Sequence, residues 1–429
     1  MTVRQLNRQP TQWWLVGIAA LALTLRLSWV LIIWPNPPLP GGDALTYLQA
    51  GQDLADGGSV NWTVMLAIGP LYPLYLSLFY RLLPEAAILP AIRICQAFMD
   101  TAMCLLVFDL GRRLFRARVG LLAASLLALD LRFITQVNNI TTETLFIFLF
   151  VAGVWAFVVA RESKKITHLG VANAILMLAA FTRAVALPIP LLLTGSLLLP
   201  KPTWQQFLVV GSMVSLVVLG VAGWSARQYQ LTGQWVIISD GFGGNFWMGS
   251  RDDGQWHGSV RFQAEVDDLR ERYNGRLAYL EDSFKTIAAD PGAYGRLLFT
   301  KLTQTYLQPY GTVTFPGESL KELLAKVIKG EMALADLITG DYFWPKLYIY
   351  LFHFFGLIGG LSGLWLTRRD WLKALPLSLP IVFLTVTYTL LTLIPRYIFP
   401  LMPFYMILAA FTINTLWQAR TAHGKGERL

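Results

Sequence analysis

The feature that most constrains this chain is a series of long apolar stretches with basic residues between them. A membrane-spanning helix needs about 20 mostly apolar residues. About ten stretches meet or approach that requirement, at approximately 12–34, 90–111, 118–136, 142–160, 167–183, 185–200, 205–226, 344–366, 374–394 and 397–418. Only 14% of the residues are charged, against about 25% in a soluble domain. The sequence therefore predicts an all-α polytopic membrane protein with about ten transmembrane helices.

Basic clusters follow alternate apolar stretches. They comprise Arg112, Arg113, Arg116 and Arg118; Arg161, Lys164 and Lys165; Lys201; Arg368, Arg369 and Lys373; and Arg420, Lys425 and Arg428. If the N-terminus lies inside and the first span is uncleaved, every cluster falls in the cytoplasm, as the positive-inside rule requires. The net charge of +9 is then an orientation signal, and no nucleic-acid partner is expected.

This topology divides the chain into three parts. Residues 1–226 form an N-terminal transmembrane module with a first outer loop at 35–89, residues 227–343 form a small α-rich extracytoplasmic domain, and residues 344–429 form C-terminal spans and a cytoplasmic tail. Within the outer loop, 69–83 is apolar, aromatic and interrupted by prolines. This pattern is typical of an interfacial helix, although a half-buried eleventh span is the alternative.

Two expectations concern the outer domain. Residues 234–250 predict a strand and turn, with Gly241, Gly243 and Gly244 as breakers. Residues 261–289 and 318–338 alternate charged and apolar residues at helical spacing and predict helices.

The outer side gathers two carboxylates. Asp43 follows Gly41 and Gly42 just beyond the first span, and a helix that starts there would bring Tyr47 onto the same face. Glu143 stands at the outer end of the fourth span. Carboxylates at a membrane edge usually face a cavity or a partner. The alternatives are a helix cap for Asp43 and a solvated first-turn residue for Glu143.

Two arginines stand in outer turns that are otherwise apolar, Arg183 and Arg396. A guanidinium matches the charge and geometry of a phosphate, while snorkelling to lipid headgroups is the alternative. Deeper in the membrane, Arg26 and Asp100 are expected to pair across adjacent helices. Near the outer end of the third span, Asp130 is expected to pair with Arg132, and the alternative is that Asp130 borders the cavity.

Several other chemistries find no support in the sequence. A Walker loop and a Gly-x-Ser-x-Gly elbow are missing, and the four histidines are scattered without zinc-site spacing. The two cysteines fall in one apolar stretch and suggest no disulfide framework.

The order of several motifs resembles a family. Leu25-Arg26-Leu27 ends the first span, Gly42-Asp43-x-x-x-Tyr47 follows, and then come Gly69-Pro70-Leu71-Tyr72-Pro73-Leu74, Thr142-Glu143-x-Leu145-Phe146, Gly243-Gly244-Asn245-Phe246-Trp247-Met248-Gly249 and Pro395-Arg396-Tyr397-x-x-Pro400. This order resembles the multi-spanning GT-C glycosyltransferases, in the branch of protein O-mannosyltransferases, aminoarabinose transferases and Rgt-like enzymes. Together the motifs cover roughly residues 12–415.

The resemblance implies an inverting glycosyltransferase that moves a sugar from a polyprenyl-phosphate-linked donor to a hydroxyl acceptor on a lipid, glycan or protein. It implies a bacterial inner (plasma) membrane enzyme of cell-envelope glycan biosynthesis, in contact with membrane lipids and with its site facing the periplasm or exterior. Asp43 would be the general base, with Glu143 orienting a substrate. Either Arg183 or Arg396 would bind the lipid phosphate. By position in the motifs, the expected substrate-binding residues also include Tyr47, Tyr72, Asn245 and Tyr397.

The sequence departs from the family pattern at two positions. Ala44 follows Asp43 where many members have a second acid, and Ser250 stands where Asn is frequent. One carboxylate is a poor Mg²⁺ site, so no metal ligand is assigned and a divalent cation has weak support. The competing function is a transporter or flippase of lipid-linked sugars, which would be expected to show internal repeats and midplane sites. A structural subunit is the third class.

Overall fold

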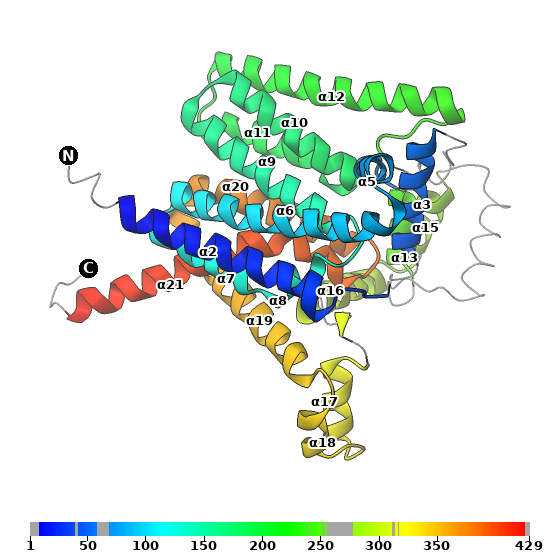
Figure 1. Ribbon diagram of the computed structural model, residues 1–429. Coiled ribbons are helices and arrows are strands. Elements are labelled where there is room, and N and C mark those ends of the chain that lie inside the picture. Colours follow the sequence, from blue (N-terminus) through cyan, green and yellow to red (C-terminus); the bar gives the residue numbers. More distant parts are fainter. Residues whose placement is uncertain are drawn as a thin grey trace.

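The computed structural model describes residues 8–38, 42–57, 68–239, 241–251, 254, 278–310, 314–315 and 317–424, and these form a helical bundle (Figure 1). The long helices are α2 (Arg8–Ser28, continued by η1, Trp29–Ile33), α6 (Glu85–Leu114), α9 (Glu143–Ser163), α10 (Ile166–Thr182), α12 (Trp204–Thr232), α19 (Phe343–Leu366), α20 (Trp371–Leu390) and α21 (Met402–Gly424). The described residues contain no strand, so the predicted all-α class is confirmed.

Shorter helices connect and cover the bundle. They are α3 (Asp43–Asp56), α5 (Leu71–Leu82), α7 (Ala117–Leu129), α8 (Leu131–Gln136), α11 (Pro188–Gly195), α13 (Gly241–Gly249), α15 (Ala278–Ala289), α16 (Pro291–Leu307), α17 (Leu320–Ile328) and α18 (Leu334–Thr339). Short 3-10 turns are η2 (Ala184–Ala186), η3 (Ser196–Leu198), η5 (Thr367–Asp370), η6 (Pro395–Tyr397) and η7 (Phe399–Leu401).

Six stretches of the described chain are long and apolar enough to cross a membrane. They are Thr11–Ile33, Glu85–Leu114, Glu143–Ser163, Trp204–Thr232, Phe343–Leu390 and Pro395–Thr421. The stretch Phe343–Leu390 contains both α19 and α20. Each of the ten predicted spans overlaps a helix or a run of short helices, while the number of crossings stays a prediction.

The core lies around α21, the most buried of these stretches, and α12 at the edge is the least buried. Helix pairs α9 and α10, α19 and α21, and α6 and α7 pack side by side. Buried apolar side chains from all six helices belong to one continuous cluster. Because van der Waals packing is the main attraction between helices in lipid, this cluster fixes how the other elements are arranged.

Two predicted ion pairs tie the helices together. Arg26 of α2 pairs with Asp100 of α6, and its guanidinium also donates to the carbonyl of Ala128 at 2.9 Å. Arg132 pairs with Asp130 at 2.6 Å, as expected. All four of these charged side chains are buried, which is tolerable in a membrane protein because each charge has a partner.

The third predicted span is not one continuous helix. Asp130 follows the last residue of α7 and is the N-cap of α8, because its side chain accepts a hydrogen bond from the backbone N–H of Arg132. A capping side chain offers the backbone an alternative to continuing the helix, and this explains the break.

The predicted strand and turn at 234–250 is also wrong, because α13 occupies most of it. Three glycines would weaken an isolated helix, but here tertiary packing decides. Phe246 and Trp247 are buried, and Gly249 approaches the backbone of Leu391 so closely that a Cβ would lie 2.5 Å away. In the predicted helical range 261–289, α15 forms the second part, and residues 261–277 lie outside the described residues. In the predicted helical range 318–338, the structure has α17 and most of α18.

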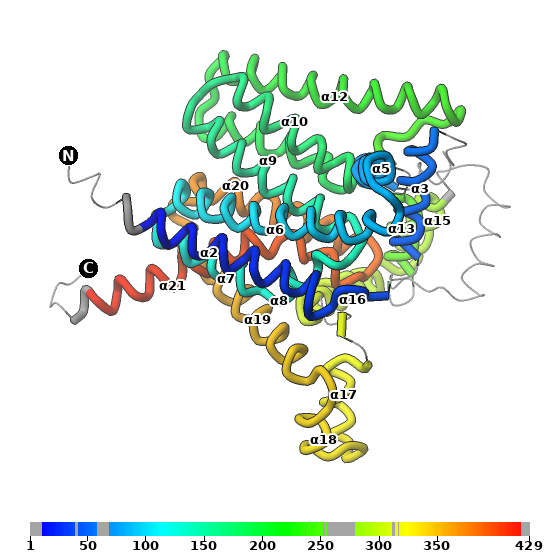
Figure 2. The backbone as a smooth tube through the Cα atoms, in the orientation of Figure 1, coloured from blue at the N-terminus to red at the C-terminus, as the bar shows by residue number. Residues whose placement is uncertain are grey.

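The two ends of the bundle differ. α2 begins and α21 ends at the same end, while α3, α5 and α13 gather at the opposite one (Figure 2). Figure 1 shows α5 nearly end-on where the long helices run across the view, so α5 crosses their direction. With 12 residues it is about 18 Å long, too short to span a bilayer and suited to lie along its surface.

Candidate active site

A cavity of about 560 Å³ opens at the end of the bundle where α3, α5 and α13 gather. Its walls come from the starts of α3 and α9, the end of α10, the following η2 and α11, α13, the end of α20 and η6. Seven of the eight predicted site residues line it: Asp43, Tyr47, Glu143, Arg183, Asn245, Arg396 and Tyr397. The eighth, Tyr72, lies behind the wall, with its ring edge-on to that of Tyr47 at 5.1 Å.

Asp43 reaches the cavity through a turn at Gly42, whose φ of +70° favours glycine. Gly42 is the N-cap of α3 and makes no side-chain cap, and Asp43 is the first helical residue. The helix-cap alternative for Asp43 is therefore wrong. Instead, its Oδ2 accepts a hydrogen bond of 2.8 Å from Nη2 of Arg396, and about half of the side chain is exposed. The carboxylate thus stands at the mouth of the cavity.

Glu143 lies deeper. Its side chain is only 1% exposed, so the solvated alternative is wrong. One oxygen, Oε1, lies 3.2 Å from Nη1 of Arg183 and 3.8 Å from Nε of Arg396. Within the described part of the chain, the other oxygen, Oε2, has no hydrogen-bond partner. A buried carboxylate oxygen without a partner is costly, and here it belongs to a residue that lines an open cavity.

The two arginines hold this cluster together. Arg183 caps the end of α10, and its guanidinium lies 5.6 Å from the ring centres of both Phe146 and Tyr397. Only 13% of its side chain is exposed, so Arg183 does not snorkel away from the cavity. Arg396 contacts both carboxylates from η6. Two guanidinium groups and two carboxylates leave the cluster with no net charge.

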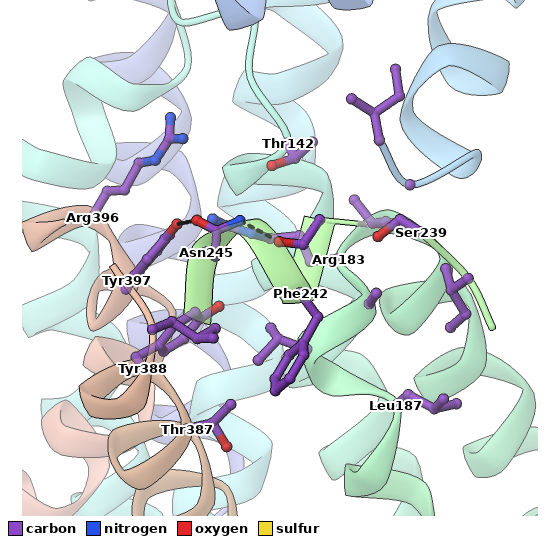
Figure 3. A pocket seen from close by; sticks show the side chains of 18 of the residues that line it. Thr142, Arg183, Leu187, Ser239, Phe242, Asn245, Thr387, Tyr388, Arg396 and Tyr397 are labelled. Carbon is purple, nitrogen blue, oxygen red and sulfur yellow. Dashed lines mark hydrogen bonds between the residues drawn. The ribbon is translucent and has the colours of Figure 1, made fainter. Parts of the chain in front are cut away.

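Asn245 has a different kind of environment. Its Nδ2 donates to the carbonyl of Gly241 at 2.7 Å, and its Oδ1 accepts from Thr392 at 3.3 Å. The same oxygen accepts from the hydroxyl of Tyr397 at 3.4 Å (Figure 3). These bonds fasten α13 to the segment that carries Arg396. Asn245 therefore lines the cavity and also positions its neighbours.

Tyr47 lies on the wall beside Asp43. Burial, together with the carboxylates of Asp43 and Glu143, raises the pKa of Tyr47 to about 12. Its hydroxyl therefore stays protonated at neutral pH and can donate a hydrogen bond to a ligand.

The sequence reasoning missed Tyr388, which lines the cavity and stacks on Tyr397 with ring centres 4.4 Å apart. Its hydroxyl is buried without a hydrogen-bond partner among the described residues. Tyr388 sits inside an apolar stretch, where nothing in the local pattern separates it from an interfacial anchor.

The remaining walls are apolar. They include Val185, Leu187, Ile237, Phe242 and Phe383. Figure 3 shows Arg396 and Leu187 on opposite sides, with Phe242 between them. The cavity can therefore take a molecule with a charged group at one end and a hydrocarbon part at the other. In the described chain, no three His, Cys, Asp or Glu side chains form a group that could hold a metal ion.

Comparisons with known proteins find a family that matches part of the chain and solved structures with a similar fold. Residues 68–224 match the family of dolichyl-phosphate-mannose-protein mannosyltransferases. A comparison with curated proteins finds no significant match.

Among solved structures, the fold is similar to that of the Archaeoglobus fulgidus oligosaccharyltransferase. The apo form gives a TM-score of 0.54 at 14% identity, covering 97% of this chain and 52% of that one. The form of this enzyme, AglB, with an inhibitory peptide and a dolichol-phosphate gives 0.52 at 14% identity, covering 97% and 52%. The form with Zn and sulfate gives 0.52 at 15% identity, covering 96% and 50%.

The chain spans about half the length of these structures. The matched segment contains Glu143 and Arg183, two members of the ion cluster. The archaeal structures share the fold of nearly the whole chain. The family match over residues 68–224 and the shared fold both support the resemblance to the GT-C glycosyltransferases that the sequence motifs indicate.

Proposed function

We propose that this protein is an inverting glycosyltransferase that moves a sugar from a polyprenyl-phosphate-linked donor to an acceptor hydroxyl. The observation that carries the proposal is the Arg396–Asp43 ion pair at the mouth of a cavity with apolar walls. This pair puts a base and a phosphate-binding group side by side. The matched family is named for a dolichyl-phosphate mannose donor, and one archaeal structure contains a dolichol-phosphate. Both support a lipid phosphate as the donor's carrier.

The transfer needs one displacement at the anomeric carbon. Asp43 accepts the proton of the acceptor hydroxyl while that oxygen forms a bond to the anomeric carbon. The bond between this carbon and the phosphate oxygen breaks, and its electron pair leaves with the phosphate. Arg396 and Arg183 stabilise the negative charge on the leaving group. A single displacement from the opposite face inverts the anomeric configuration.

The ion pairs act as a resting arrangement. A donor phosphate that binds Arg396 competes with Asp43 for the same guanidinium. This exchange frees the Asp43 carboxylate at the moment when a base is required. The cluster is neutral before binding, so the negative charge of the donor phosphate is what allows it to replace Asp43 as the partner of Arg396. The half-exposed position of Asp43 allows its side chain to move.

Glu143 is expected to bind rather than to react. Its Oε1 is occupied by Arg183, whereas its Oε2 is buried without a partner. A hydroxyl of the sugar or of the acceptor would satisfy this oxygen. Tyr47 and Tyr388 offer further hydroxyls in the same cavity.

The proposed location is a bacterial inner membrane, with this cavity at the periplasmic or exterior face. It is at the end opposite the basic loops, where the lipid-linked donor would place its phosphate at the membrane surface. The outer segment 227–343 would cover the cavity and take part in acceptor binding, since α13 already forms one wall.

The test is transfer by purified protein in liposomes that contain a polyprenyl-phosphate sugar with a radiolabelled sugar. The expected result is label in an acceptor and release of the polyprenyl phosphate. Movement of the donor across the bilayer without release of the phosphate would contradict the proposal and favour a flippase. Transfer from a nucleotide sugar without a lipid donor would also contradict it.

A further inference from the structure

A second cavity of about 520 Å³ lies at the other end of the same helices. Its lining comes from the end of α9, the start of α10, η3, the start of α12 and the start of α20. Three of its lining residues, Arg161, Lys164 and Lys165, are basic. We call it the basic cavity.

The first cavity contains the ion cluster of Asp43, Glu143, Arg183 and Arg396, and we call it the ion-cluster cavity. The basic cavity and the ion-cluster cavity lie at opposite ends of α9 and α10. Glu143 begins α9 and Arg161 lies near its end, and Lys165 precedes α10 while Arg183 follows it. With 21 residues, α9 is about 31 Å long, which matches the hydrocarbon thickness of a bilayer. The basic cavity therefore lies at the opposite membrane interface, among the basic loops.

The charge in this cavity is of one sign. Arg161, Lys164 and Lys165 line it, and its described lining contains no carboxylate. The neighbouring Glu162 is exposed and pairs with Arg113 of α6 instead. Arg161 donates to the carbonyl of Leu372 at 3.0 Å and so joins α9 to α20. Both lysines are exposed, and their ammonium groups can turn toward an anion.

The rest of the lining is mainly apolar, with four uncharged polar side chains among the apolar ones. The hydroxyl of Ser196 and the amides of Gln205 and Gln206 lie beside leucine side chains. Two apolar lining residues, Ile166 and Leu199, are about half exposed. In addition, α10 starts without a side-chain cap, so its first backbone N–H groups are available to an anion. Cations next to exposed hydrocarbon are complementary to a phospholipid, because the cations can bind the phosphate of its headgroup and the hydrocarbon can contact the first part of its acyl chains.

We propose that the basic cavity binds the phosphate of an anionic phospholipid from the leaflet on its own side of the membrane. Lys164 and Lys165 contact the phosphate, and the acyl chains lie against Leu199 and Ile166. Basic pockets between helices at this interface are suited to such headgroups. The bound lipid would bridge α9, α10, α12 and α20, of which α12 is the least buried. This site is separate from the proposed sugar transfer.

The test measures lipid binding to the purified full chain in a neutral detergent by native mass spectrometry. The probes are phosphatidylglycerol, phosphatidylcholine and inorganic phosphate. The variant is Lys164→Asn with Lys165→Gln. Lys164 has φ +56°, and asparagine is among the residues that tolerate this left-handed conformation best. The control, Arg368→Gln with Arg369→Gln, removes two exposed charges at the same interface that do not line the cavity.

Wild type should prefer phosphatidylglycerol to phosphatidylcholine. The lysine variant should bind phosphatidylglycerol roughly fivefold to thirtyfold more weakly, since each basic group near an anionic surface contributes about 1 kcal/mol. The arginine control should stay within about twofold of wild type. An equal loss of phosphatidylglycerol affinity in both variants would mean that only the general surface charge matters, and this would overturn the proposal. Equal binding of the two lipids would overturn it as well, as would inorganic phosphate that displaces the lipid at equal concentration.

Discussion

The two cavities have similar volumes, about 560 and 520 Å³, and share α9, α10 and α20. They differ in whether the charged side chains that line them are paired with opposite charges. In the ion-cluster cavity each arginine contacts a carboxylate, and Glu143 and Arg183 are almost wholly enclosed. In the basic cavity three cations share the lining with no carboxylate, and the two lysines are exposed. Enclosed charges require partners because desolvation is costly, whereas exposed lysines are solvated by water.

This difference indicates two modes of anion binding. In a neutral, enclosed cluster an anionic ligand must displace a carboxylate from its arginine. The displaced carboxylate loses its ion-pair partner and is then free to accept a proton. That property suits a reaction. An exposed group of like charges attracts an anion without releasing anything, and that property suits attachment to a membrane lipid. The predictions below test the comparison from its largest consequence to its smallest.

The first consequence is all-or-none: the two cavities should open to opposite aqueous phases. Gln49→Cys places a thiol on the exposed side of α3 near the ion-cluster cavity, and Arg369→Cys places one near the basic cavity. In a background where Cys95 is Ser, an impermeant thiol reagent should label position 49 in intact cells and position 369 only after permeabilisation. Labelling of both positions in intact cells, or the reverse order, would contradict the proposed topology.

The second prediction concerns the base. Asp43→Asn keeps the size of the side chain but cannot accept a proton at neutral pH, so transfer should fall by about 10²–10⁴-fold. The variant should remain folded, because an exposed ion pair contributes only about 0–1 kcal/mol. Transfer rates with saturating donor and thermal unfolding separate the two effects. Near-normal turnover would remove Asp43 from the reaction and leave Glu143 as the next candidate.

Much of the ion-cluster cavity could be predicted from the sequence. Alternating basic loops assign Asp43, Glu143, Arg183 and Arg396 to one side of the membrane, and this requires no knowledge of packing. Which carboxylate meets which arginine could not be predicted. Asp43 and Arg396 are 353 residues apart, and their contact depends on how α3 and η6 are placed by the whole bundle.

Other features depended on tertiary structure. Three glycines indicated a turn where α13 forms, because the burial of Trp247 and the close approach of Gly249 to Leu391 outweigh local propensity. The basic cavity was not predicted at all. In the sequence Lys164 and Lys165 indicate only topology, and the leucines that complete the cavity come from α10, from η3 and the residue after it, and from α20.

The third prediction addresses the phosphate. In Arg396→Lys the positive charge remains but the bidentate geometry is lost. Hydrogen bonds to charged groups contribute about 1.5–3 kcal/mol, so donor affinity should fall roughly tenfold or more. Arg368→Lys is the matched control, since Arg368 is exposed among the basic loops and does not line the ion-cluster cavity. Lower stability of Arg396→Lys with unchanged donor affinity would assign Arg396 a purely structural role.

The smallest expected effect is on stability at the basic cavity. In neutral detergent without added lipid, Lys164→Asn with Lys165→Gln should change the free energy of unfolding by no more than about 0.5 kcal/mol, as is usual for exposed positions. The reason is that neither lysine is enclosed, and the hydrogen bond from Arg161 to the carbonyl of Leu372, which joins α9 to α20, is untouched. Thermal unfolding with added phosphatidylglycerol then supplies the contrast. A ligand at 100 times its dissociation constant stabilises the folded state by about 2.7 kcal/mol, so wild type should gain stability and the lysine variant should gain clearly less. A large loss of stability without lipid would mean that the lysines have structural partners, and the contrast between the two cavities would fail.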